Sequence, residues 1–173
     1  MDEAGNQLTV QVDTEGGSPL RCCLRESDPG EPMLLIAYTP PGTCGAYAER
    51  GPVFIHAEPC AGYLTPSRYP PGLSHRLQVV RAYDRDGRIV GGVMVNDGEH
   101  AMTVIRELLA RPDVSLVHLR NVGYGCYNFA VRRVKAPPEH VGPLVGRGYQ
   151  QPQAMTMAAA NWGSCGGGVR GSA

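Results

Sequence analysis

Cysteine, histidine and arginine residues stand inside or next to apolar, strand-like runs of this chain, at residues 20–25, 53–60 and 117–121. Polar groups that fold into or beside a core need partners, so their concentration on these segments indicates a buried network or a functional site. The chain carries no complete catalytic signature. The pattern therefore predicts where chemistry takes place and leaves the reaction open.

Cys23 is the first candidate nucleophile. If residues 20–25 form a strand, side-chain alternation places Cys23 on one face between Arg21 and Arg25. A cationic neighbourhood favours the thiolate, which is the reactive form of a cysteine. Cys22 falls on the opposite face between leucines, and we interpret it as an inert core thiol.

His56 ends an apolar run and leads into a loop that carries Cys60. A sheet fixes the direction of such a side chain and the loop gives access, so we predict His56, Cys23 and Cys60 as catalytic residues. Two alternatives stay open, a satisfied structural histidine and a metal site completed by Cys23, His118 or Cys126. Because no paired Cys-x-x-Cys spacing is present, we assign no metal ligand and no cofactor.

Arg81 and Arg120 each share a predicted strand face with apolar residues. A buried arginine needs a carboxylate, a carbonyl or a bound anion, so both are candidates for holding an anionic substrate. The alternative is an internal ion pair with Glu49, Glu58 or Asp84.

The Gly-rich segment 121–129 lacks the spacing of a phosphate-binding loop, and no helix follows it. We interpret it as a turn whose aromatic and amide side chains can line a pocket. The predicted substrate-binding residues are Arg81, Arg120, Arg25, Asn121, Tyr124 and Cys126.

Composition excludes several classes of protein. The 173 residues include 16 basic and 16 acidic side chains, so bulk charge does not favour nucleic acid or an anionic membrane. The N-terminus is acidic and polar, unlike a signal peptide, and no apolar run is long enough to span a membrane. We expect a cytoplasmic protein, whose six cysteines are thiols, metal ligands or redox centres before they are disulfides.

Hydrophobic periodicity and turn residues predict a chain composed mainly of strands. Residues 84–87 form the turn of a predicted hairpin, and a helix over about 98–111 is capped by Asn96 or Asp97. The predicted fold is α+β, a mostly antiparallel sheet of about six to eight strands with one main helix. The predicted strands cover residues 8–12, 20–25, 33–38, 53–57, 77–83, 88–95, 114–120 and 127–134.

The chain divides into a compact domain over 1–135 and a tail over 136–173. The tail is rich in Pro, Gly and Ala, and we predict that it is poorly ordered. A short helix around Met155 and Met157 that docks on the domain is the alternative.

Several segments, in order and at matching intervals, resemble the bacterial family known as domain of unknown function 1203. The resemblance covers about residues 20–134 and brings no established activity. It implies a small cytosolic bacterial domain, encoded beside a metabolic or natural-product pathway. The segments that carry it are residues 21–25, 29–31, 37–40, 49–60, 81–84, 118–121 and 125–127.

These observations support a small enzyme that acts on a compact anionic or carbonyl-bearing metabolite through a Cys/His/Arg site. A non-catalytic ligand-binding or partner-binding domain and a zinc-stabilised structural domain are the alternatives. The expected partner is a small molecule, with no nucleic acid and no membrane. An exposed sheet edge makes a homodimer a further expectation.

Overall fold

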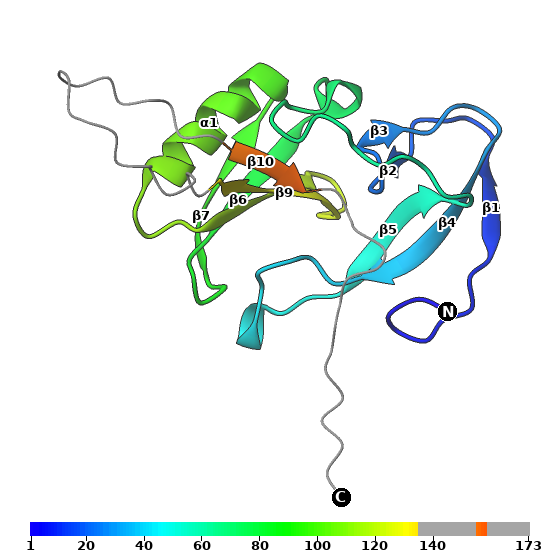
Figure 1. Ribbon diagram of the computed structural model, residues 1–173, viewed down its shortest axis with the longest axis horizontal. Helices are drawn as coiled ribbons and strands as arrows, with labels where there is room; N and C mark the ends of the chain where they lie inside the picture. The colour runs from blue at the N-terminus through cyan, green and yellow to red at the C-terminus, as the bar shows by residue number, and fades with distance from the viewer. Residues whose placement is uncertain (135–154, 159–173) are drawn as a thin grey trace, which may run out of the picture.

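The protein folds into two five-stranded sheets and one α-helix within residues 1–134 and 155–158, which are the residues that the computed structural model describes (Figure 1). Sheet A has the order β1-β4-β5-β2-β3 and is antiparallel except where β2 pairs with β5. Its strands are β1 (Val10–Asp13), β4 (Glu31–Tyr38), β5 (Gly51–His56), β2 (Pro19–Leu20) and β3 (Arg25–Glu26).

Sheet B has the order β10-β9-β8-β6-β7, and all its strand pairs are antiparallel. The predicted α+β class with mostly antiparallel strands and one main helix is confirmed, and the strands divide between two sheets. The strands of sheet B are β6 (Gln78–Tyr83), β7 (Ile89–Val95), β8 (Leu116–Asn121), β9 (Tyr127–Arg133) and β10 (Met155–Ala158).

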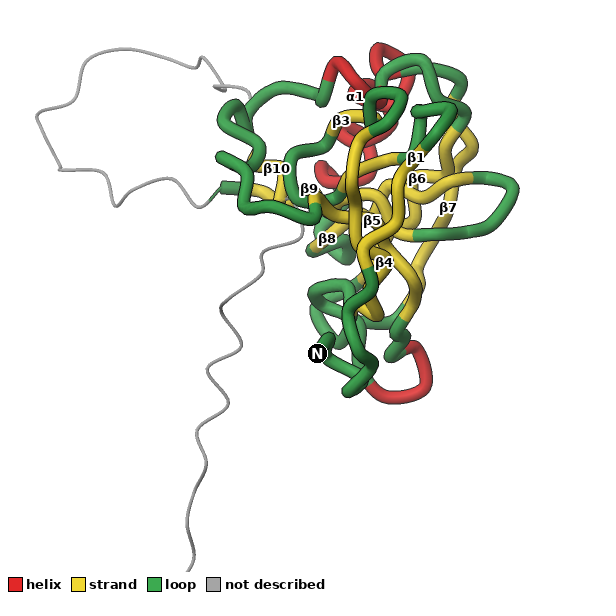
Figure 2. Tube along the Cα trace, turned by 90° about the vertical axis from the view of Figure 1, so that its right-hand side faces the viewer, coloured by secondary structure: helices red, strands yellow, loops and turns green. Residues whose placement is uncertain are grey.

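Sheet B lies between the helix and sheet A, and its two faces differ in chemistry. One face presents Val80, Leu119 and Phe129 to the main hydrophobic core beneath the helix. The other face presents Tyr83 and Tyr127 to sheet A. Figure 2 shows β4 and β5 of sheet A in front of the strands of sheet B. Arg81 of β6 and Arg120 of β8 lie on this second face, because they alternate with the residues of the first. Asn121 falls on the first face, two residues after Leu119.

Helix α1 (Gly98–Ala110) buries the face that its periodicity predicted, including Ala101, Val104 and Ile105. The Asp97 carboxylate accepts a hydrogen bond of 2.8 Å from the His100 backbone N–H and so caps the first turn. The predicted hairpin of β6 and β7 is also confirmed.

Residues 20–25 do not form the single strand that we predicted. The chain leaves β2 at Leu20, makes a turn and enters β3 at Arg25, and the Leu24 backbone N–H donates to the Leu20 carbonyl at 2.9 Å. Leu20 and Leu24 are both buried, which anchors the two ends of the turn in the interior. The face assignment of Cys22 and Cys23 is therefore wrong, because alternation does not apply within a turn.

Residues 155–158 fall in the predicted tail, and they form strand β10 against β9 instead of the alternative short helix. Met157 is buried in the main core. Trp162 and Cys165, with the rest of that segment, lie outside the described residues. The helix found in the described residues falls short of the length and apolarity of a membrane span.

Candidate functional site

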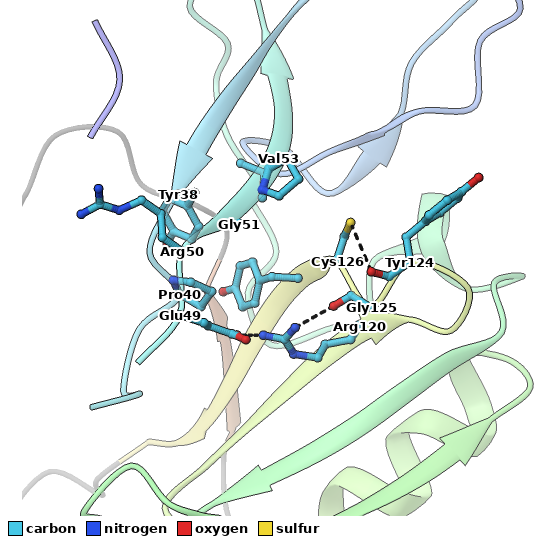
Figure 3. Close-up of a pocket in the computed structure, with 12 residues that line it drawn as sticks. Tyr38, Pro40, Glu49, Arg50, Gly51, Val53, Arg120, Tyr124, Gly125 and Cys126 are labelled. Carbon is cyan, nitrogen blue, oxygen red and sulfur yellow. Dashed lines mark hydrogen bonds and ion pairs between the residues drawn. The ribbon is translucent and has the colours of Figure 1, made fainter. Parts of the chain in front are cut away.

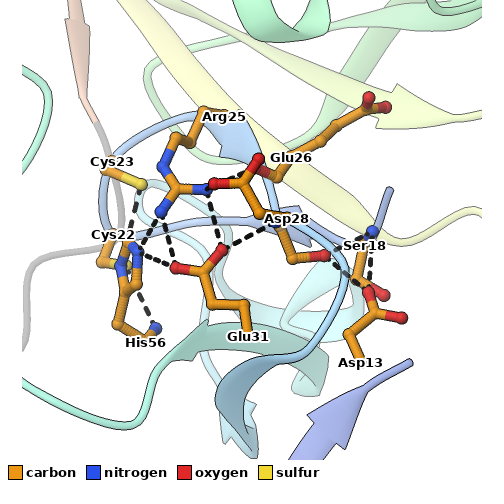
Figure 4. A network of polar contacts seen from close by, with 10 residues as sticks. Asp13, Ser18, Cys22, Cys23, Arg25, Glu26, Asp28, Glu31 and His56 are labelled. Atoms are coloured by element: carbon orange, nitrogen blue, oxygen red, sulfur yellow. Dashed lines mark hydrogen bonds and ion pairs between the residues drawn. The ribbon is translucent and has the colours of Figure 1, made fainter. Parts of the chain in front are cut away.

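Three cysteines and one histidine converge at one end of sheet A. Figure 4 shows two of these cysteines, Cys22 and Cys23, beside His56. The thiol sulfurs and one imidazole nitrogen all lie within 4.8 Å of one another. The Nδ1 atom of His56 is 3.0 Å from Cys22 Sγ and 3.8 Å from Cys23 Sγ. We call this group the thiol cluster; its members are Cys22, Cys23, His56 and Cys60.

Two neighbouring segments of sheet A bring the cluster together. Cys22 and Cys23 occupy the turn between β2 and β3, whereas His56 is the last residue of β5 and Cys60 lies in the loop that follows. The Arg21 backbone N–H donates to the Phe54 carbonyl at 2.8 Å, which fixes the turn beside the end of β5. The His56 backbone N–H also points at Cys22 Sγ, at 3.4 Å.

The turn that carries the two adjacent cysteines contains a strained residue. Leu24 has a φ of 59°, which makes it the non-glycine residue with positive φ within the described chain. This conformation costs an ordinary residue roughly 1–2 kcal/mol. It is held here because Leu24 is buried, and it lets Cys22 and Cys23 face one imidazole instead of opposite sides of a sheet.

The second ring nitrogen of His56 faces a carboxylate. Nε2 lies 2.9 Å from Glu31 Oε1 and also 2.9 Å from an Arg25 nitrogen, while Arg25 makes a two-pronged contact with Glu31 at 2.6 and 2.9 Å. The Arg25 hydrogen bonds lower the pKa of Glu31 to about 2. The ionised carboxylate favours the tautomer with the proton on Nε2, and in that tautomer the Nδ1 lone pair faces the sulfurs.

The thiols of the cluster are not equivalent. The hydrogen bond between Cys22 and Cys23 raises the pKa of Cys22 to about 12 and lowers the pKa of Cys23. Burial raises the pKa of Cys60. Without a cation at the centre, the first proton is therefore lost from Cys23.

A cavity of about 510 Å³ borders the cluster. His56, Cys22 and Cys60 line it together with apolar side chains that include Leu34 and Ile55. The cluster is thus close to the surface and open to small molecules on one side.

The predicted catalytic residues Cys23, His56 and Cys60 lie together, and Arg25 lies beside them. The predicted substrate-binding residues Arg81 and Arg120 lie outside the thiol cluster. Arg120 pairs with Glu49, and Arg81 Nη1 lies 4.0 Å from the same carboxylate. This is the internal ion pair that stood as the alternative.

Arg120, Tyr124 and Cys126 line a second cavity, of about 180 Å³, which shares no lining residue with the first (Figure 3). The Tyr124 side chain is largely exposed at its edge. Asn121 accepts a hydrogen bond of 3.0 Å from Asn128 and belongs to a structural amide network.

Sequence reasoning missed two members of the first site. Cys22 was interpreted as an inert core thiol, yet it is the closest sulfur to His56. Glu31 was not singled out, because a carboxylate after a Pro-Gly turn carries no local signal. Its role depends on the pairing of β4 with β5, which sets Met33 opposite His56.

A sequence model of the family described as "Protein of unknown function (DUF1203)" matches residues 17–133 of the chain. The match covers more than half of the chain, so the protein belongs to this family. The chain matches no curated protein and no solved structure.

Proposed function

We propose that this protein is a metal-binding domain that holds a zinc ion, or another thiophilic divalent metal, in the thiol cluster. The observation that carries the proposal is the set of donors: three sulfurs and one imidazole nitrogen, all within 4.8 Å of one another. A Cys3His set of four donors is a standard closed zinc site.

The distances suit such an ion. Tetrahedral zinc, with bonds of about 2.0–2.3 Å, separates its ligand atoms by roughly 3.3–3.8 Å. The two sulfur–nitrogen distances in the cluster, 3.0 Å from Cys22 and 3.8 Å from Cys23 to His56 Nδ1, lie within a few tenths of an ångström of that range.

The surroundings of the cluster also suit a cation. Zinc ligation deprotonates thiols, and three thiolates with a divalent ion leave one net negative charge. The Arg25 guanidinium, 2.9 Å from His56 Nε2, lies where it offsets this charge. Glu31 supplies the outer carboxylate that metal-bound histidines commonly contact.

The direct test is metal content. The full chain, purified without chelators or immobilised metal, is expected to contain about one zinc per chain by elemental analysis. Reconstitution with Co²⁺ is expected to give the intense visible and near-ultraviolet absorption of tetrahedral thiolate coordination. Cys22→Ser is expected to remove both signals, whereas Cys44→Ser, which changes an exposed thiol outside the cluster, is expected to keep them.

A chain that takes up neither zinc nor cobalt while its thiols are free and reduced overturns the proposal. The same holds if Cys44→Ser abolishes binding as completely as Cys22→Ser does.

The cavity beside the cluster favours a second candidate, a small cytosolic enzyme acting on a compact anionic or carbonyl-bearing metabolite. Cys23 or Cys60 would be the nucleophile or redox thiol, and His56 would move a proton. Iodoacetamide separates the two candidates: rapid alkylation of one cluster thiol in protein as purified supports the enzyme, and protection that ends on chelation supports the metal site. The reducing cytosol and the bacterial pathway context stay predictions.

A further inference from the structure

The second cavity, between the two sheets, is separate from the thiol cluster (Figure 3). Its polar wall comes from β8, β9 and the segment that precedes β5, and its volume of about 180 Å³ suits a molecule of a few heavy atoms. The polar groups that decide what it can hold are Arg120, Tyr127 and Glu49.

Arg120 is 5% exposed, and its hydrogen bonds are incomplete. One terminal nitrogen donates to the Gly125 carbonyl at 2.6 Å, and the other contacts Glu49. The Nε atom is buried and has no partner among the described residues. A buried guanidinium N–H without an acceptor is costly, so this edge of the group favours an incoming acceptor.

Tyr127 presents a second unused donor. Its ring is 4% exposed, and its hydroxyl is buried without a partner among the described residues. Burial raises the pKa of Tyr127, so the hydroxyl keeps its proton and is able to donate.

The charges around the cavity are unbalanced. Arg81 and Arg120 share the single carboxylate of Glu49. Arg21 lies behind Tyr127 and is 2% exposed, and it donates to the carbonyls of Tyr127 and Pro19 without an ion pair in the described part of the chain. Arg81 and Arg120 therefore share one carboxylate, and Arg21, which does not line the cavity, is compensated among the described residues by carbonyls alone. This excess of positive charge favours a further anion.

We propose that this cavity is a binding site for a compact carboxylate, held by Arg120 and Tyr127. A planar carboxylate is able to accept from Nε and a terminal nitrogen of one guanidinium at once, which is the bidentate geometry that arginine favours. The Tyr127 hydroxyl donates a third hydrogen bond.

Glu49 is an internal competitor in this site. It occupies one nitrogen of Arg120 and leaves Nε free, and its side chain is 33% exposed, so it has room to move toward solvent. A ligand carboxylate that displaces it restores the same charge and satisfies the two donors that now lack acceptors.

The test measures binding of acetate, glycolate and succinate by calorimetry and by amide chemical shifts, at constant ionic strength. Arg120→Lys is expected to weaken the best of these ligands by about tenfold, because a lysine lacks the planar fork. Tyr127→Phe is expected to weaken it by roughly three- to tenfold, the value of one hydrogen bond. Glu49→Gln is expected to strengthen it, because the internal competitor loses its charge.

Arg85→Gln, which changes a distant arginine in the turn between β6 and β7, serves as the control and is expected to leave binding unchanged. Thermal unfolding of each variant separates lost binding from lost folding, and Tyr127→Phe keeps the ring that packs in the interior.

Absence of binding by both the wild-type chain and Glu49→Gln overturns the proposal. The proposal is also overturned if Arg85→Gln weakens the affinity for the carboxylates as much as Arg120→Lys does, because binding then follows the net charge of the chain and not the cavity. Inorganic phosphate that binds more tightly than every carboxylate overturns the assigned class of ligand.

Discussion

The Nε2 atom of His56 lies 2.9 Å from the Oε1 atom of Glu31, on the side of the ring away from the thiols. The contact favours a proton on Nε2, and this tautomer leaves Nδ1 as the available donor for a metal.

Glu31→Gln is expected to weaken zinc binding by about tenfold or more, which is the usual effect of removing an outer carboxylate. A competition titration with a chromophoric chelator measures the change. Glu26→Gln is the matched control, because Glu26 is also a partly buried carboxylate of sheet A but pairs with Arg76 and His75. Equal affinities of the Glu31 and Glu26 variants would remove the role assigned to Glu31.

Chelation is expected to lower the thermal stability of the wild-type chain, because metal binding is coupled to folding. Differential scanning calorimetry with and without EDTA measures this effect. Cys60→Ser is expected to start from a lower Tm and to show little further loss on chelation. Cys44→Ser should retain the full response, and a Cys60→Ser protein that responds like wild type would exclude Cys60 as a ligand.

His118 is expected to make folding stability depend on pH. It is fully buried on the face of sheet B that meets sheet A, its Nε2 faces the Pro41 carbonyl at 2.9 Å, and Nδ1 has no partner among the described residues. Burial lowers its pKa to about 4, and Arg81 and Arg132 repel the charged form further.

Because the unfolded histidine titrates near its ordinary pKa of about 6.5, the unfolded chain binds more protons than the folded chain between about pH 6.5 and 4. Stability therefore falls as pH falls through this window, by about 2 kcal/mol for this group alone between about pH 7 and pH 4.5. Urea denaturation of His118→Gln should show a pH dependence smaller by that amount. His100→Gln changes an exposed histidine, and its stability should depend on pH as that of the wild type does. The thiols and carboxylates that also titrate are the same in every variant, so their contribution cancels in the comparison.

Asp97→Ala is expected to cost about 1 kcal/mol of folding free energy, because it removes the cap of α1. Glu107→Ala, at an exposed position within the same helix, should change stability by less than about 0.5 kcal/mol. Urea denaturation of both variants tests the assignment, and equal losses would contradict it.

Local sequence patterns were sufficient to predict the helix and the hairpin of β6 and β7. Their caps, turns and periodic apolar residues lie within a few positions of one another. The turn at residues 21–24 escaped the same reasoning because Leu20 and Leu24 stand four residues apart. That spacing puts both side chains inward in a strand and equally in a turn closed by a hydrogen bond between these two residues. The sequence pattern does not separate the two cases.

The candidate site was predicted in part for a related reason. Cys23, His56 and Cys60 were recognised by residue type, and the sheet brings them together. Glu31 required the register of β4 against β5, which is set by long-range pairing. Arg120 was recognised as a buried cation, but only the fold shows that it lines a separate cavity.

The turn between β2 and β3 also decides how sheet A ends. Strand β2 pairs with β5 through the single pair of Leu20 and Phe54, so few backbone hydrogen bonds hold β2 and the turn that follows it against β5. A metal bound by Cys22 and His56, which stand 34 positions apart, would close the chain between them into a loop and hold β2 and its turn against β5. Without the metal, β2 would be free to leave the edge of β5 that it now covers at Phe54, and the whole edge of this six-residue strand would then be open to a strand from a second chain. Loss of the metal and association of two chains would in this way be coupled to each other.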